Sequence, residues 1–297
     1  MKRISIRLAD GDMSCLMWDE AGEQAPLLHL AHATGMNAQC YRQLGELLKH
    51  RFRIIMSDAR GHGFSTLPAD PDAQEDWSGF ERDLHGLLSH FGEPALLVGH
   101  SMGATVTLMY AAASPALVRG VVLIDPAVIS LEKADALVAA RRAGTAGDNE
   151  LAAGARKRRR HWTSRAEIRE KYDGRGMFAW WKEGILDDYL DGGLITHADG
   201  SVSLACAPEW EAATFNCIDI LRVWKMAPRL SVPAALLRAE VRSTLTENDE
   251  AAFKRLVPHL ETQFAPGRSH FLPMEDPGLA ADFILRQADR MLARAAA

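Results

Sequence analysis

The chain has 297 residues, of which 47% are hydrophobic and 25% are charged, and its formal net charge is −5. These values are typical of a folded, water-soluble protein, and the acidic balance excludes nucleic acid as the main partner, because phosphate binding requires a basic surface. The amino-terminal residues form no signal peptide, and no run of about eighteen apolar residues is present to span a bilayer, so we expect a cytoplasmic protein without membrane association.

The first predicted element is an antiparallel hairpin. Alternating apolar residues at 4–8 lead into the turn Asp10-Gly11-Asp12, and residues 13–18 return. A period of two that is interrupted by an Asp-Gly turn is the signature of two paired strands.

After the hairpin, short apolar runs alternate with segments of helical periodicity. The runs are expected to be strands buried on both faces, and they lie at 27–33, 52–58, 95–100, 120–125, 234–239 and 260–265. The segments with helical spacing lie at 39–49, 74–91, 102–113, 247–257 and 276–294. This alternation predicts an α/β protein with a mainly parallel sheet, helices on both faces and the hairpin at one edge.

Residues 130–226 interrupt the alternation. They hold no obvious parallel strand, carry dense charge and include five of the seven tryptophans. We predict a largely helical insertion at 130–226 between two core segments, 1–129 and 227–297. Its basic run 156–165, RKRRRHWTSR, is expected to be a solvated helix face, with attraction of an anionic substrate as the alternative.

The most informative motif is Gly-His-Ser-Met-Gly at 99–103, which follows a predicted buried strand and opens a predicted helix. A G-x-S-x-G sequence in this context predicts a sharp strand-to-helix turn that exposes the Ser101 hydroxyl, with Gly99 and Gly103 leaving room for the neighbouring strand and helix. The turn also directs the Met102 amide, at a helix N-terminus, toward an oxygen that becomes negative. Ser101 is therefore the candidate nucleophile, and Met102 the first oxyanion donor.

With this motif, the order of elements resembles the α/β-hydrolase superfamily over most of the chain, and in particular its capped serine hydrolases. The resemblance implies an α/β-hydrolase fold in which the insertion forms a cap over the active site. Residues 31–38, AHATGMNA, resemble the oxyanion loop of that family, with Ala33 where a glycine is usual, and this makes the Thr34 amide the second oxyanion donor. Residues 57–65, SDARGHGFS, are similar to a family turn that supports the nucleophile loop.

A serine hydroxyl needs a base to take its proton, and His270 is the candidate. It lies in the segment 265–277, APGRSHFLPMEDP, after the last predicted strand and before the final helix. This position matches the histidine loop of the family, and the order serine then histidine also agrees. His259, in the preceding helix-to-strand connection, is the weaker candidate.

The acid that should orient the histidine is missing from its usual place in the family. Most members carry it in a G-x-x-D pattern just beyond the strand after the insertion. Here that pattern places Ala239 at the glycine and Arg242 at the acid. An arginine cannot replace a carboxylate, because it offers only hydrogen-bond donors and stays cationic.

Two carboxylates remain as candidates for the acid. Asp125 is the first choice, since a minority of the family carries the acid at that strand end, and parallel strands bring it to the same sheet edge as Ser101. Glu240 is the second choice, because it lies closer to the usual acid position. The third alternative is a site with no acid or with one that acts through a water molecule.

Apolar and aromatic side chains of the insertion are the candidates for the substrate cavity. They lie at helical spacings in 176–190 and 206–217, and the ones expected to line the cavity are Met177, Phe178, Trp181, Trp210 and Phe215. The competing interpretation is that they pack the cap onto the core. The expected partner is a small-molecule substrate with apolar or aromatic character.

We therefore expect a serine hydrolase that cleaves a carboxylic ester or lactone through an acyl-enzyme. A serine hydrolase of this kind is expected to need no cofactor. No metal is expected either, since the four cysteines show neither a CxxC pair nor metal-site spacing. Hydrolysis of a carbon–carbon bond and acyl transfer use the same residues and stay open. Arg242 also keeps open a catalytically silent ligand-binding protein, and the sequence allows a homodimer as well as a monomer.

Overall fold

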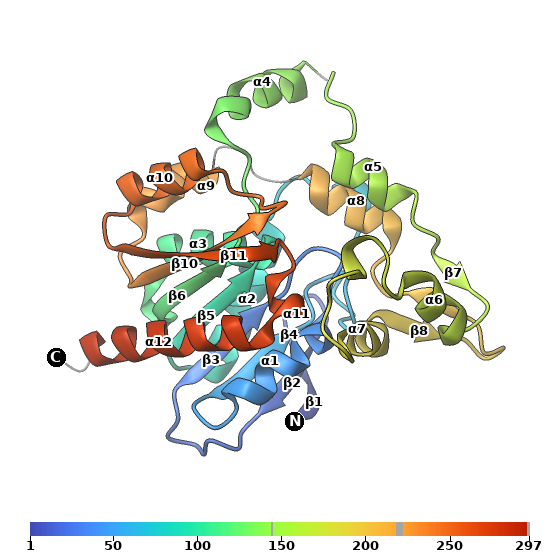
Figure 1. The fold of residues 1–297 in the computed structure, drawn as a ribbon, viewed down its shortest axis with the longest axis horizontal. Coiled ribbons are helices and arrows are strands. Elements are labelled where there is room, and N and C mark those ends of the chain that lie inside the picture. Colours follow the sequence, from blue (N-terminus) through green and yellow to red (C-terminus); the bar gives the residue numbers. More distant parts are fainter. Residues whose placement is uncertain (144, 218–221, 296–297) are drawn as a thin grey trace.

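The computed structural model describes residues 1–143, 145–217 and 222–295, and its centre is an eight-stranded sheet in the order β1-β2-β4-β3-β5-β6-β10-β11 (Figure 1). Strand β1 pairs antiparallel with β2, and β2 with β4, whereas every later pair is parallel. The predicted parallel sheet with an antiparallel hairpin at one edge is confirmed. The strands are β1 (Lys2–Arg7), β2 (Asp12–Trp18), β3 (Leu27–Ala31), β4 (Arg53–Ser57), β5 (Ala95–His100), β6 (Val118–Ile124), β10 (Ala234–Val241) and β11 (Leu260–Ser269).

The register of the central strands determines which side chains meet at the carboxyl edge. All six residues of β5 are buried, as expected for an apolar strand that is covered on both faces. His100, the last residue of β5, pairs with Ile124, the last residue of β6. Ser101 and Asp125 are therefore the first residues beyond two hydrogen-bonded neighbouring strands.

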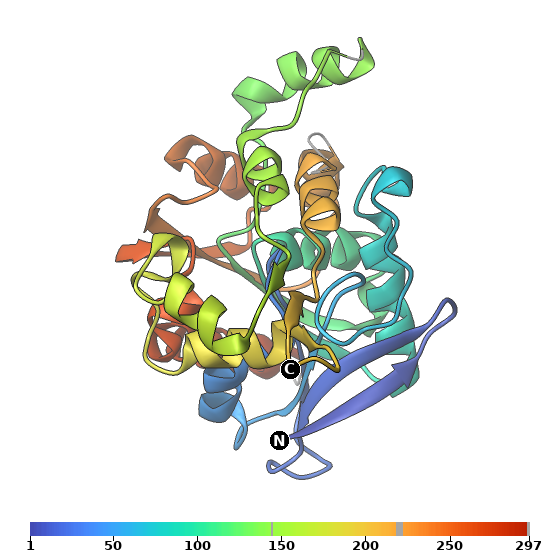
Figure 2. The ribbon, with the colours of Figure 1, turned by 90° about the vertical axis from the view of Figure 1, so that its right-hand side faces the viewer.

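Helices cover both faces of the sheet and complete two apolar cores (Figures 1 and 2). One face is covered by α2 (Ser78–Phe91), α3 (Met102–Ala113) and α10 (Glu247–Leu256). The other is covered by α1 (Arg42–Leu48) and α12 (Pro277–Ala295), which follows the single turn α11 (Leu272–Glu275). Among the described residues, no helix combines the length and the apolar character needed to cross a membrane.

The turn after β4 is built around a fully buried carboxylate. Asp58 accepts hydrogen bonds from the Ala38 and Phe64 amides, at 2.8 and 3.1 Å, and from Nη1 of Arg3 at 2.9 Å. A buried charge is stable only when it is paired and hydrogen-bonded in this way. The hydrogen-bonded turn predicted for 57–65 is therefore present, and its direct partner is the end of the segment 31–38.

Most of the insertion is helical, but it also contains a small antiparallel sheet in the order β7-β9-β8. That sheet was not expected, because its strands have two or three residues and are too short to show a period of two. Helix α4 projects away from the rest of the molecule in both views (Figures 1 and 2). The elements are α4 (Leu131–Arg142), α5 (Glu150–Arg156), β7 (His161–Trp162), α6 (Arg165–Tyr172), α7 (Ile185–Gly193), β8 (Leu194–Thr196), β9 (Val202–Leu204), α8 (Pro208–Asn216) and α9 (Arg222–Met226).

Helix α8 packs on the core, and Trp210 is its largest buried side chain there. Trp210 is buried, its ring packs beside Phe80 with the centroids 6.2 Å apart, and its Nε1 donates to the Arg60 carbonyl at 3.1 Å. Gly61 makes this contact possible: its φ is +71°, and a Cβ there would lie 2.2 Å from Nε1 of Trp210. Val223 and Trp224 of α9 also lie in the core cluster that contains α3, so the last part of the proposed cap range packs on the core.

We predict that Trp210→Ala lowers the free energy of unfolding by about 3–5 kcal/mol, because it removes a buried aromatic side chain and leaves a cavity. Trp180→Ala is the matched control: Trp180 is 56% exposed, and a change of less than about 1 kcal/mol is expected. Both values can be measured by urea unfolding at equilibrium. Equal losses in the two variants would contradict this role of Trp210.

Candidate active site

Ser101 occupies the sharp turn that the motif predicts. Its backbone has φ 55° and ψ −120° between β5 and α3, and its amide donates to the Ile124 carbonyl at 3.0 Å. The flanking positions have no room for a side chain. A Cβ on Gly99 would lie 2.4 Å from the Gly103 carbonyl oxygen, and one on Gly103 would lie 2.3 Å from the carbonyl oxygen of Ala31. The hydroxyl is thereby held beyond the end of the sheet.

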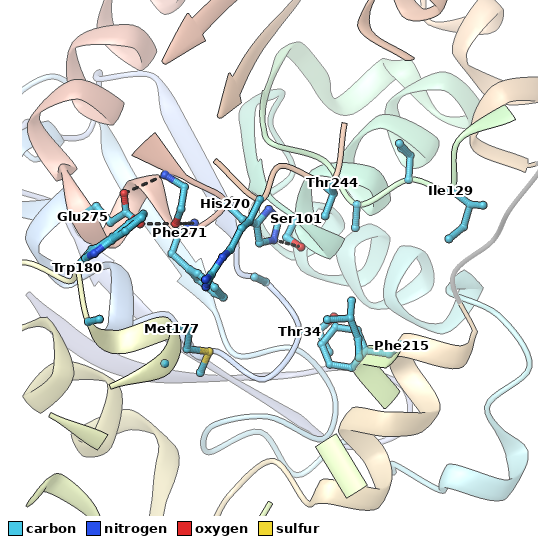
Figure 3. Close-up of a pocket in the computed structure, with 18 of the residues that line it drawn as sticks. Thr34, Ser101, Ile129, Met177, Trp180, Phe215, Thr244, His270, Phe271 and Glu275 are labelled. Carbon is cyan, nitrogen blue, oxygen red and sulfur yellow. Dashed lines mark hydrogen bonds between the residues drawn. The ribbon is translucent and has the colours of Figure 1, made fainter. Parts of the chain in front are cut away.

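Ser101, His270 and Asp125 form a continuous hydrogen-bonded chain. Nε2 of His270 lies 2.9 Å from Oγ of Ser101 (Figure 3), and Nδ1 of His270 lies 2.6 Å from Oδ2 of Asp125. Because a carboxylate only accepts, Nδ1 carries the proton and Nε2 is free to accept from the serine hydroxyl. This is the arrangement that makes a serine hydroxyl nucleophilic.

Asp125 is held as a carboxylate although it is fully buried. The Ala239 amide at 2.9 Å and the Ser243 hydroxyl at 2.6 Å donate to Oδ1, and the Thr244 amide donates to Oδ2 at 3.2 Å. Burial opposes its ionisation, but the hydrogen bond and charge of His270, together with the donors on Oδ1, outweigh burial and lower the pKa of Asp125. The carboxylate can therefore fix the tautomer of the histidine.

Glu240, the second choice for the acid, lies elsewhere. Its side chain is exposed, and its Oε2 accepts from the Gly267 amide at 2.6 Å. Glu240 lies where the pairing of β10 with β11 shifts register, and Nδ1 of His270 is bonded to Asp125 instead. The glutamate candidate is therefore wrong as the partner of His270.

Two backbone amides are available beside the nucleophile. Neither the Thr34 amide nor the Met102 amide donates to another group within the described part of the chain, and Thr34 lines the same cavity as Ser101. Such free amides can bind an oxyanion. His32 braces this loop, since its Nδ1 donates to the Ala33 carbonyl at 2.7 Å and its Nε2 accepts from the Ala59 amide at 2.9 Å.

A second hydrogen-bonded chain joins this loop to the histidine loop. The Ala33 amide donates to the Tyr41 hydroxyl at 3.1 Å, the hydroxyl lies 2.6 Å from Nδ1 of His100, and Nε2 of His100 lies 2.7 Å from the His270 carbonyl. A carbonyl only accepts, so His100 donates from Nε2 and Tyr41 donates to Nδ1. Burial and the nearby His270 lower the pKa of His100 to about 3, so this histidine stays neutral beside its neighbour.

The chemistry faces an apolar cavity of about 470 Å³ between the sheet edge and the insertion. Met177 and Phe215 line it, as predicted, and both can be followed in Figure 3. Trp180, which the sequence analysis did not select, also lines it. The sequence could not show which of the two faces the cavity, because Trp180 and Trp181 are identical neighbours in the same apolar segment.

The prediction that five residues line the cavity was wrong for three of them, Phe178, Trp181 and Trp210. These side chains pack within the insertion or between the insertion and the core. Phe178 stacks on Tyr172 with the ring centroids 4.6 Å apart, and Trp181 lies edge-on to Phe178 at 4.7 Å. Trp210 is the buried contact between α8 and the core. Burying large rings against one another gains more apolar contact than lining an open cavity, and the competing interpretation therefore holds for these residues.

The basic run at 156–165 makes ion pairs inside the insertion. These pairs join Arg156 to Asp148, Arg158 to Glu211, Arg159 to Glu167 and Arg165 to Asp191. None of these arginines lines the cavity of Ser101. Among the residues that the structure describes, no group of three or more His, Cys, Asp or Glu side chains is placed to hold a metal ion.

Comparison with known proteins gives a family and several relatives. The profile of the Alpha/beta hydrolase family matches residues 30–283. The chain is 38% identical over 122 residues to the 2-(acetamidomethylene)succinate hydrolase of Mesorhizobium japonicum. The matched segment covers 40% of this chain and 43% of the relative. It is 30% identical over 132 residues to the monoglyceride lipase of Rattus norvegicus, covering 41% and 42%. The matches thus span about two fifths of the length of these relatives.

Solved structures share the whole architecture at low identity. A crystal structure of E-2-(acetamidomethylene)succinate hydrolase superimposes with a TM-score of 0.73 at 24% identity, over 97% of this chain and 100% of the other. A peroxisomal alpha-beta-hydrolase from Saccharomyces cerevisiae gives 0.76 at 15% identity, over 99% and 89%. These likenesses establish the fold, and the predicted α/β-hydrolase fold is confirmed.

We predict that Tyr41→Phe slows the reaction of Ser101 with a fluorophosphonate by about 10- to 100-fold, because the loop of Thr34 and the loop of His270 lose their shared support. Tyr110→Phe is the matched control: its hydroxyl also contacts a histidine, His85, at 3.2 Å. Labelling rates across pH measure the effect. Equal rates in the two variants would show that the Tyr41 chain is only structural.

Proposed function

The chain belongs to the alpha/beta hydrolase family, and on this basis we propose that it is a cofactor-independent serine hydrolase that cleaves a carboxylic ester or lactone. The observation that carries the proposal is the hydrogen-bonded chain from Ser101 through His270 to Asp125, at 2.9 and 2.6 Å. A serine hydroxyl that donates to a histidine held by a buried carboxylate is equipped to attack a carbonyl carbon.

In the first half of the proposed reaction, Oγ of Ser101 attacks the carbonyl carbon while Nε2 of His270 takes its proton. Asp125 stabilises the histidine as it becomes a cation. The carbonyl oxygen becomes negative and is bound by the Met102 and Thr34 amides. His270 then gives the proton to the departing alcohol oxygen, the carbon–oxygen bond breaks, and an ester of Ser101 remains.

In the second half, water replaces the alcohol. Nε2 of His270 takes a proton from the water molecule as it attacks the acyl carbon, and the same amides hold the second oxyanion. His270 then returns the proton to Oγ of Ser101, and the carboxylic acid leaves. One base thus serves both halves because the two tetrahedral intermediates occupy nearly the same place.

The cavity supports a small substrate with apolar character. Its volume of about 470 Å³ lies within the range of small-molecule sites, and Met177, Trp180 and Phe215 give it apolar walls. Relatives are named for hydrolysis of substituted succinates and for lipase action on monoglycerides, so both acidic and neutral acyl compounds are represented among them. A small molecule in the cytoplasm is the only partner that this reaction requires, and the protein can act as a monomer or a homodimer.

Two other activities use the same groups. A carbon–carbon bond hydrolase would need the carbon leaving group to be protonated, and an acyltransferase would admit an alcohol in place of water. Product analysis in the presence of an added alcohol distinguishes these outcomes from ester hydrolysis. A silent binding protein has less support, since Asp125 provides the contact to His270 that Arg242 cannot.

We predict that Asp125→Asn lowers kcat for a chromogenic short-chain ester by roughly 10⁴, because the histidine loses the carboxylate that fixes its tautomer. Ser101→Ala should abolish both turnover and covalent labelling by a fluorophosphonate. Steady-state kinetics and mass spectrometry of the labelled protein provide the two measurements.

Glu240→Gln is the matched control for Asp125→Asn, since it neutralises a carboxylate whose hydrogen bond, within the described residues, comes from the Gly267 amide and not from His270. It should retain turnover within a few-fold of the unmodified protein. Near-full turnover in Asp125→Asn together with a large loss in Glu240→Gln would overturn the assignment. Absence of any labelling of Ser101 in the unmodified protein would count against a serine hydrolase.

A further inference from the structure

Arg242 lies between residues that are bonded to the proposed catalytic groups. On one side, the Val241 carbonyl accepts from the His270 amide at 3.1 Å. On the other, the Ser243 hydroxyl and the Thr244 amide donate to Asp125 at 2.6 and 3.2 Å. The backbone at Arg242, including its Cα, is therefore fixed relative to His270 and Asp125.

The backbone at this residue is strained. Three non-glycine residues have positive φ in the described part of the chain, and they are Ser101 at 55°, Asp125 at 40° and Arg242 at 52°. The pairing of β10 with β11 is also irregular just before Arg242: Ala239 lies opposite Ala265, whereas Val241 lies opposite Ser269. Irregular pairing and strained residues beside active sites redirect side chains. Arg242 is thus directed to a place that regular strand geometry would not reach.

Arg242 is one of the residues that line the cavity of Ser101 and His270, and it is exposed to solvent. Within the described residues it forms no ion pair and no hydrogen bond with another group. Arg238, four residues earlier, shows the contrast: it pairs with Glu250 at 2.6 Å and lies over the ring of Phe264. A cation that faces an apolar cavity without a partner has its donors available to a ligand.

The nearby carboxylates are already engaged. Glu240 accepts from the Gly267 amide, and both carboxylate oxygens of Glu275, which also lines the cavity, accept from the amide and hydroxyl of Ser269 (Figure 3). Neither neutralises Arg242. The cavity therefore offers apolar walls, the attacking hydroxyl, the hydrogen-bonded carboxylate of Glu275 and the positive charge of Arg242, which forms no ion pair within the described residues.

We propose that Arg242 binds a carboxylate of the substrate, so that the natural substrate of the proposed hydrolase is an ester or lactone carrying a free carboxylate. The planar guanidinium matches the two oxygens of a carboxylate and can donate to both. This inference rests on the proposed function and names its substrate class. It also gives Arg242 a role of its own at the position where related chains carry the catalytic acid.

The test compares esters that differ by one carboxylate. On the acyl side, mono-4-nitrophenyl adipate is compared with 4-nitrophenyl hexanoate, in which a methyl group replaces the carboxylate. On the alcohol side, the acetate ester of 3-hydroxybenzoate is compared with phenyl acetate. The readout is the ratio of kcat/KM within each pair, measured for the unmodified protein and for its Arg242→Met and Arg242→Lys variants after subtraction of spontaneous hydrolysis.

We expect the unmodified protein to prefer the carboxylated ester of at least one pair. Arg242→Met should lower that ratio about tenfold, the scale of a charge-assisted hydrogen bond. Arg242→Lys should restore part of the preference, because it keeps the charge but not the paired donors. The preference should also weaken as salt is raised.

Arg255→Met is the matched control, since Arg255 is exposed on α10 and does not line the cavity. It removes the same charge and should leave both ratios unchanged. Hydrolysis of the neutral esters with no preference for either carboxylated ester, or a preference that Arg242→Met leaves intact, overturns the role of Arg242 and leaves the hydrolase proposal standing. Failure of all four esters, together with an unlabelled Ser101, would instead overturn the proposed function.

Discussion

The pairing of His100 with Ile124 is the constraint on which the rest of the site depends. Because β5 and β6 are parallel and end in register, Ser101 and Asp125 are placed side by side at the same sheet edge. Both residues have positive φ, at a cost of about 1–3 kcal/mol each. The buried strands and the helices behind them supply the packing that stabilises this strained arrangement.

The loops at that edge are joined by buried hydrogen bonds. Asp125 contacts the end of β10 and the residues after it, while the chain from Ala33 through Tyr41 and His100 reaches the His270 carbonyl. Each of these bonds links segments that lie far apart in the sequence. The loss of one leaves an unsatisfied buried group, so the loops are held as one unit around the serine hydroxyl.

The aromatic and basic side chains of the insertion have different structural roles. Its aromatic residues divide into those that pack the insertion, such as Trp210, and those that face the cavity, such as Trp180. Its basic run is neutralised by carboxylates of the insertion. Arg242, which lines the cavity and forms no ion pair within the described residues, instead follows strand β10 of the core. The apolar walls and the positive charge at the cavity therefore come from different parts of the chain.

The sequence by itself determined the sheet, its hairpin, the turn at Ser101 and the candidate histidine, because strand periodicity, glycine spacing and chain order are local signals. It also left three alternatives for the acid: Asp125, Glu240, or a site with no acid or with one that acts through water. Only the tertiary structure decided among them, identified which aromatic residues face the cavity, and revealed the contacts of Tyr41 and His100 and the place of Arg242 at the cavity. Those outcomes depend on strand register, on irregular strand pairing and on packing between distant segments, and none of these is encoded in a short stretch of sequence.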